Sequence, residues 1–113
     1  MDGNDVLSQF NFFTEASKKY GIVLYKFNYD GSVFGNYDVI YRLKKTEIKF
    51  NNDRNFMSVT ISAGKNQHHD YFVLLSKKLG IPLYDCNKLP ESERLLEVIR
   101  RVLDTLIDLL NSL

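Results

Sequence analysis

Two adjacent histidines and a single cysteine are the residues of this chain best suited to an active site. His68 and His69 precede Asp70, and such a set could bind a metal ion or transfer protons. Neighbouring side chains point in different directions, however, and helical zinc ligands usually stand four positions apart. Asp70 also stands where it would cap a helix, and no third ligand is nearby. We therefore interpret 64–69 as a solvated polar loop and predict no metal site and no cofactor.

Cys86 is the only cysteine, so it cannot form an internal disulfide, which is typical of a reducing compartment. Paired with a histidine it would resemble a nucleophile and its base, but the sequence does not fix that distance. We interpret Cys86 as a small buried hydrophobe. The sequence contains no glycine-rich phosphate loop and no pair of carboxylates in an apolar setting. We therefore expect a protein that is not an enzyme.

Length and charge narrow the class of protein further. The 113 residues suit one domain over 1–113, and 15 basic residues balance 14 acidic ones to a net charge of +1. Such a balance gives no long-range field that would attract nucleic acid or acidic lipid. The polar, acidic start lacks the features of a signal peptide, and no apolar stretch is long enough to span a bilayer. We expect a cytoplasmic protein without membrane contact.

Helical periodicity is found near both ends of the chain. A first helix over 6–20 is predicted by apolar residues three and four positions apart, namely Val6, Phe10, Phe13, Ala16 and Tyr20. A short helix over 71–79 has Asp70 as its cap and Gly80 as its end. The last helix runs from Pro90 to near the end, and its apolar face is wider than one sheet requires. Either this helix packs between the sheet and another helix, or the part of its apolar face that the sheet leaves uncovered forms a homodimer interface.

Between 22 and 63 the hydrophobic period changes to two, which predicts strands over 22–29, 37–43, 46–50 and 56–63. Short connections make the last three strands antiparallel neighbours. The expected fold is α+β, with a four-stranded antiparallel sheet and three helices packed on one face in the order α-β-β-β-β-α-α. The residues expected to face the helices are Val23, Tyr25, Phe27, Tyr29, Val39, Tyr41, Leu43, Ile48, Phe50, Met57, Val59, Ile61 and Ala63.

The other face of this sheet is the predicted binding surface. Its candidate contact residues are Lys26, Asp38, Arg42, Glu47, Lys49 and Phe56. Acids interleaved with the basic groups, and Phe56 as the only aromatic residue expected there, argue against a groove that tracks phosphates. Charges of both signs around the apolar anchors Leu24, Ile40 and Phe56 instead favour a protein partner.

In size and organisation the chain resembles small cytosolic immunity proteins that bacteria encode beside secreted toxins, including those of contact-dependent growth inhibition systems. The resemblance lies in a helix ending Lys18-Lys19-Tyr20-Gly21, strands containing Ile48-Lys49-Phe50 and Phe56-Met57-Ser58, and two closing helices. It covers most of the chain without a diagnostic motif, so no residue role carries over. Many such proteins are acidic, whereas this chain is near neutral.

The resemblance implies a non-enzymatic inhibitor that binds a cognate toxin in the cytoplasm. The alternatives are a homodimeric structural or regulatory protein that associates through the C-terminal helix, a nucleic-acid-binding module, and a small hydrolase or metal protein that uses His68, His69 or Cys86.

Overall fold

The computed structural model describes residues 3–32, 35–64 and 67–112. Their elements are α1 (Gly3–Gln9), α2 (Asn11–Lys18), β1 (Val23–Asp30), β2 (Asn36–Leu43), β3 (Thr46–Asp53), β4 (Phe56–Ala63), β5 (His68–Asp70), α3 (Tyr71–Leu79), a short 3-10 helix (Cys86–Lys88) and α4 (Glu91–Ser112).

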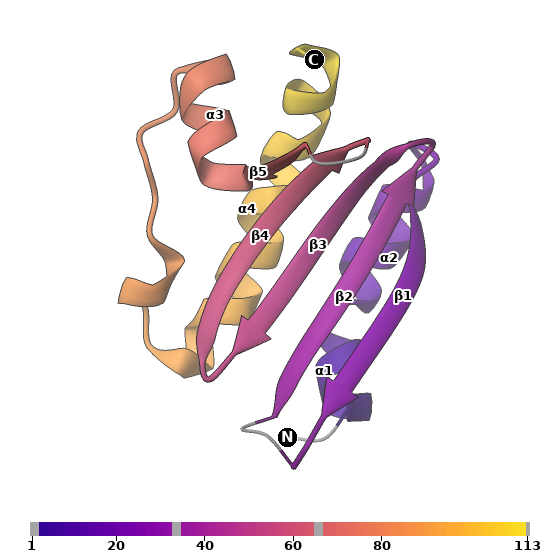
Figure 1. Ribbon diagram of the computed structural model, residues 1–113, viewed down its shortest axis with the longest axis vertical. Coiled ribbons are helices and arrows are strands. Elements are labelled where there is room, and N and C mark those ends of the chain that lie inside the picture. The colour runs from indigo at the N-terminus through magenta and orange to yellow at the C-terminus, as the bar shows by residue number, and fades with distance from the viewer. Residues whose placement is uncertain (1–2, 33–34, 65–66, 113) are drawn as a thin grey trace.

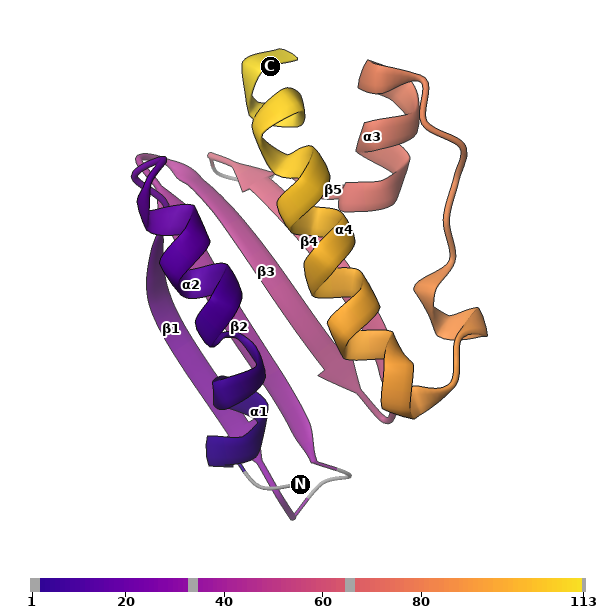
Figure 2. The same ribbon diagram turned by 180° about the vertical axis from the view of Figure 1, so that it is seen from behind.

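The strands form one antiparallel sheet in the order β1-β2-β3-β4-β5. Helices α1, α2 and α4 cover one face of this sheet, and α3 packs beside α4 near β5 (Figures 1 and 2). The predicted α+β class and antiparallel sheet are confirmed. The predicted numbers are corrected, because the described residues form five strands and four α-helices rather than four and three.

The helix predicted over 6–20 is divided into α1 and α2 at Phe10. The Phe10 N–H donates to the Leu7 carbonyl at 3.0 Å, a tighter turn than that of an α-helix. The apolar stripe survives this break, because Val6, Phe10 and Phe13 are all buried. Tyr20 was expected on the same stripe, but it follows the end of α2 and is 52% exposed.

Strands β2, β3 and β4 confirm most of the predicted alternation. The buried residues that were expected to face the helices are Val39, Tyr41, Ile48, Phe50, Met57, Val59 and Ile61. Leu43 is only partly buried and Ala63 is exposed, since both lie at strand ends. β3 also continues to Asp53, beyond its predicted end at residue 50, because its last residues pair with the start of β4.

Strand β1 departs from the predicted alternation at a β-bulge. Leu24 pairs with Tyr41 and Lys26 with Ile40, so Tyr25 is an extra residue without a partner of its own. A bulge reverses the alternation on one side of it. Val23 and Tyr25 were therefore predicted wrongly, being 50% and 53% exposed, while Leu24 packs against the core rather than on the outer face.

The segment predicted as a polar loop contains the short strand β5. Its residues 68–70 pair with 60–62 of β4, whereas residues 65 and 66 of the predicted loop lie outside the described residues. The helix after β5 matches its prediction. Asp70 accepts a hydrogen bond from the Val73 N–H at 3.0 Å, and Gly80 ends the helix with a φ of +69°.

β5 covers only part of the β4 edge, and the Asn87 side chain covers another part. The Met57 N–H donates to Asn87 Oδ1 at 2.8 Å, and Asn87 Nδ2 donates to the Met57 carbonyl at 2.9 Å. The carboxamide thus replaces the missing neighbour strand at one residue, which satisfies two edge groups that a strand would otherwise bond.

The core is richest in aromatic side chains beneath α2. Phe13 stands edge-on to Tyr41 and to Phe50, with ring centroids 4.7 and 5.4 Å apart, and Phe10 stands 5.1 Å from Phe50. Helix α4 packs against the sheet side and between α2 and α3, which agrees with the first of the two interpretations of its wide apolar face. Among the described residues of α4, Leu96 is the large hydrophobic side chain that is exposed, at 57%.

Candidate protein-binding face

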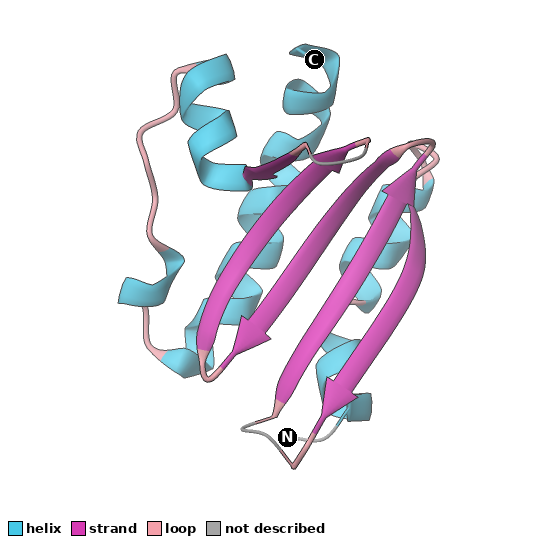
Figure 3. Cartoon of the chain, viewed as in Figure 1, coloured by secondary structure: helices cyan, strands magenta, loops and turns pink. Residues whose placement is uncertain are grey.

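The face of the sheet opposite the helices carries no helix, as Figure 3 shows, and we call it the outer face. Five of the six predicted contact residues lie on it in adjacent cross-strand rows. Arg42 pairs with Glu47, Asp38 pairs with Asn51, and the row between them contains Lys26, Ile40 and Lys49. Adjacent rows on one face lie about 7 Å apart, so these five side chains form one continuous surface.

Arg42 is held by two neighbours. Its Nη2 donates to Glu47 Oε1 at 2.5 Å and its Nε donates to the same oxygen at 3.2 Å. The guanidinium carbon also lies 3.6 Å from the centroid of the Tyr25 ring. The hydrogen bond with Glu47 is the main cause that raises the pKa of Arg42, so the arginine stays charged. Ion pair and ring together fix a cation and an aromatic side chain on the surface.

The sequence reasoning missed Tyr25, which it placed in the core. Tyr25 is the bulged residue of β1, and the bulge turns its ring to the outer face above Arg42. No signal in the local pattern could have identified it, since Tyr25, Phe27 and Tyr29 alternate as a regular buried strand would.

The remaining charges of the outer face differ in how they are partnered. Asp38 accepts a hydrogen bond from the Asn51 side chain. Lys26 is exposed and Lys49 is partly exposed, and within the described residues neither has a side-chain hydrogen bond or an ion pair. Their charges are therefore available to a partner on both sides of Ile40.

Phe56, the sixth predicted residue, is not brought together with the other five. It pairs with Asp53 at the start of β4, roughly 20 Å along the sheet from the row of Glu47. It is 60% exposed and shares a hollow of about 450 Å³ with Val73 and Leu83, which is itself 70% exposed. Leu83 was missed because a leucine in an irregular connection carries no periodic signal.

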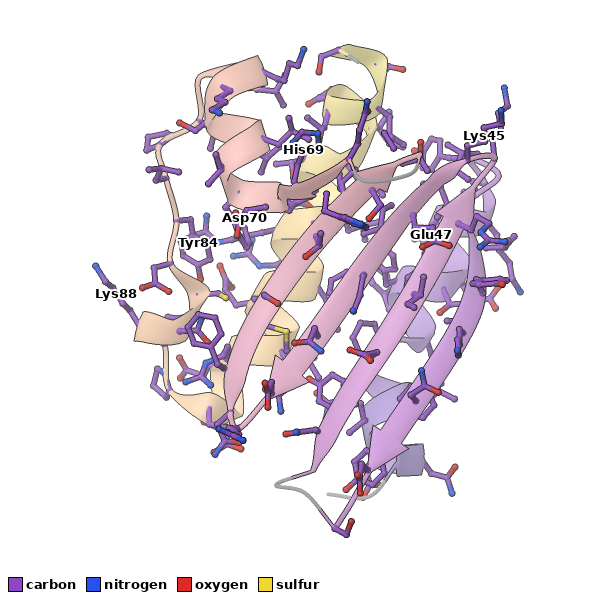
Figure 4. The ribbon with its side chains drawn as sticks, in the orientation of Figure 1. Lys45, Glu47, His69, Asp70, Tyr84 and Lys88 are labelled. Carbon is purple, nitrogen blue, oxygen red and sulfur yellow. The ribbon has the colours of Figure 1, made fainter. Side chains whose placement is uncertain are left out.

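The structure separates the residues first considered for catalysis. His68 Nδ1 lies 2.6 Å from the Ser62 hydroxyl, whereas His69 is the next residue of a strand and points to the opposite face. Figure 4 shows Asp70 at the start of α3, at the β5 edge of the sheet and away from Glu47 on β3. In the described part of the chain, no three His, Cys, Asp or Glu side chains converge closely enough to hold a metal ion.

Cys86 is not paired with a histidine. It is 3% exposed beside Met57, whose carbonyl lies 3.5 Å from its sulfur, while the histidines pair near the other end of β4. Burial raises the pKa of the Cys86 thiol to about 11, so it is protonated near neutral pH. Among the described residues the thiol is therefore not placed beside either histidine, although Cys86 lines the same hollow as Phe56, Val73 and Leu83.

The length of the helices and the comparison with known proteins also bear on function. Across the described residues, no helix combines the length and the apolar composition needed to cross a bilayer. Neither a protein-family model, nor a curated protein sequence, nor a solved structure shows significant similarity to this chain. A functional proposal therefore depends on the geometry of the molecule itself.

Proposed function

We propose that this chain is a non-enzymatic protein-binding domain, most concretely an immunity protein that binds and inhibits a cognate bacterial toxin in the cytoplasm. One observation supports this proposal above the others: a whole sheet face free of helices carries fixed charges of both signs beside an exposed aromatic ring. The resemblance in size and organisation described above supplies the class of partner.

The outer face has an appropriate size for such a partner. Strands of eight residues extend about 26 Å, and four strands spaced about 4.8 Å apart give a face of roughly 500 Å². A stable interface buries about 800 Å² on each partner. A partner would therefore have to cover the outer face and also part of its rim, such as the hollow at Phe56 and Leu83.

The chemistry of the face also suits a protein. Arg42 already contacts both Glu47 and Tyr25, so a partner that engages these three side chains orders few of them and loses little conformational entropy. Tyr25 is of a residue type enriched among binding hot spots. Lys26 and Lys49 would accelerate association with an acidic patch on the partner.

The structure favours this proposal over two of the alternatives. A homodimer through α4 is less favoured, because α4 packs between α2 and α3 and its exposed side chains, apart from Leu96, are polar or charged. A nucleic-acid surface would not place Asp38 and Glu47 among its basic groups.

The experiment tests protection first and the surface second. The protein encoded beside this gene is expressed without and with this chain, and we expect growth arrest in the first case and rescue in the second. The double variant Lys26→Glu/Lys49→Glu should bind that toxin at least tenfold more weakly by calorimetry. Its unfolding free energy should stay within about 0.5 kcal/mol per substitution of the parent, since both lysines are unpaired.

Lys19→Glu/Lys78→Glu is the matched control, because it changes the net charge equally on the helical side of the molecule. Equal weakening by the two double variants would show that net charge rather than the outer face is responsible. Absence of rescue together with absence of binding would refute the immunity function itself.

A further inference from the structure

A cleft of about 960 Å³ lies on the helical side of the sheet, between α1 and the first turns of α4. The two helical segments diverge toward this end of the sheet, as Figure 2 shows. The floor of the cleft is one cross-strand row, made of Tyr29, Tyr37, Asn52 and Met57. Its volume falls in the range of small-molecule sites.

The floor contains two polar side chains that have no protein partner among the described residues. Asn52 lies on the same face as the core residue Phe50, yet within the described residues its carboxamide has no hydrogen bond. The Tyr37 hydroxyl also has none there, although the residue is only 8% exposed. Burial raises the pKa of Tyr37, so its hydroxyl remains a neutral donor. Polar groups in such a position normally bind water or a ligand.

Two opposite charges stand on the wall above this floor. Glu91 and Arg94 come from the first turn of α4, and both act electrostatically on Tyr37. The Arg94 guanidinium is fixed, because it donates to the Leu89 carbonyl at 3.1 Å and to the Asn55 carbonyl. The rest of the lining is mixed: Val6 and Leu95 are apolar and come from opposite helices, whereas Gln9, Asn55 and Ser92 are polar.

We propose that this cleft binds a small uncharged molecule with a flat apolar body and a carboxamide or lactam edge. Because the charges of Glu91 and Arg94 nearly cancel, the cleft offers no net attraction to an ion that must lose its hydration, whereas a neutral dipolar group can direct its oxygen to Arg94 and its N–H to Glu91. Asn52 offers one donor and one acceptor side by side, the complement of such an edge. The apolar body lies between Val6, Leu95 and Met57.

The cleft and the outer face are on opposite sides of the sheet, so this inference is tested independently of the proposed function. The probe is benzamide, titrated into ¹⁵N-labelled protein and followed by NMR. We expect shift changes confined to the Asn52 side-chain amide and the backbone amides around Val6 and Leu95. Benzoate and benzylammonium, which share the ring but carry a net charge, should bind at least tenfold more weakly.

Two variants assign the polar contacts. Asn52→Leu and Tyr37→Phe should each weaken benzamide binding about tenfold, as expected for one lost hydrogen bond. Tyr37→Phe keeps the ring in place, which preserves the test if Asn52→Leu fails to fold. Asn28→Ala, on the outer face, is the control and should bind normally. Absence of shifts in the cleft, binding of either ion as tightly as benzamide, or normal binding by both cleft variants would overturn the proposal.

Discussion

The side chain of Asn87 should contribute to stability out of proportion to its position in an irregular segment. It makes two hydrogen bonds with the backbone of Met57, at 2.8 and 2.9 Å. Each such bond contributes about 1 kcal/mol net, so Asn87→Ala should cost about 2 kcal/mol. For a chain of this length the unfolding entropy is about 0.24 kcal/mol/K, and the melting temperature should fall by about 8 °C.

Urea denaturation and hydrogen exchange measure this effect. The Met57 amide should exchange faster in Asn87→Ala, because its hydrogen-bond acceptor is gone. Amides paired between β2 and β3 should still exchange only through global unfolding, as they do in the parent protein. Asn28→Ala is the control, since the Asn28 side chain is exposed and makes no hydrogen bond within the described residues. A loss below about 0.5 kcal/mol with unchanged Met57 protection would refute the role of Asn87 as an edge partner.

Three further outcomes follow from the structure. Phe50→Ala should cost about 3–5 kcal/mol in urea denaturation, because the ring is fully buried among three others; a cost under about 1 kcal/mol would contradict that packing. Asp70→Ala should cost about 1 kcal/mol through the lost helix cap, and an unchanged melting temperature would argue against the cap. Burial raises the pKa of Tyr41 and of Tyr71 to about 12 and that of Cys86 to about 11, above the ordinary values of 10.0 and 9.0. The folded chain then holds more protons than the unfolded chain, so stability should be full below about pH 9 and decrease as the pH rises toward 12. Denaturation across this pH series would show no such decrease if these groups ionised freely in the folded state.

How much of the fold can be predicted from sequence depends on how local each determinant is. The prediction of α3 was correct at both ends, because Asp70 and Gly80 determine the first and last turns of the helix locally. β2, β3 and β4 were correctly predicted to be antiparallel neighbours with alternating buried residues, because short turns join them. Residues that are close in the sequence determine these features.

The predictions were wrong where the local structure depends on a segment that is distant in the sequence. The bulge in β1 reflects pairing with β2, and nothing in the order Tyr25, Phe27, Tyr29 reveals the extra residue. β5 is three residues long and exists because β4 offers it an edge. Of the candidate site, the five charged residues were correctly placed on one face, while Tyr25 was missed and Phe56 was joined to a cluster that it does not reach.

The bulge in β1 has a consequence for behaviour at high concentration. β1 is a terminal strand of the sheet, with no neighbour beyond it among the described strands. A long, flat terminal strand would recruit strands of other molecules and begin fibril growth, and natural sheets prevent this by bulges and by outward lysines. Here the extra Tyr25 interrupts the regular spacing of backbone groups, and Lys26 adds a charge beside it. Deleting Tyr25 would remove the interruption and leave only the charge of Lys26 as protection, so we expect the shortened chain to precipitate at a lower concentration.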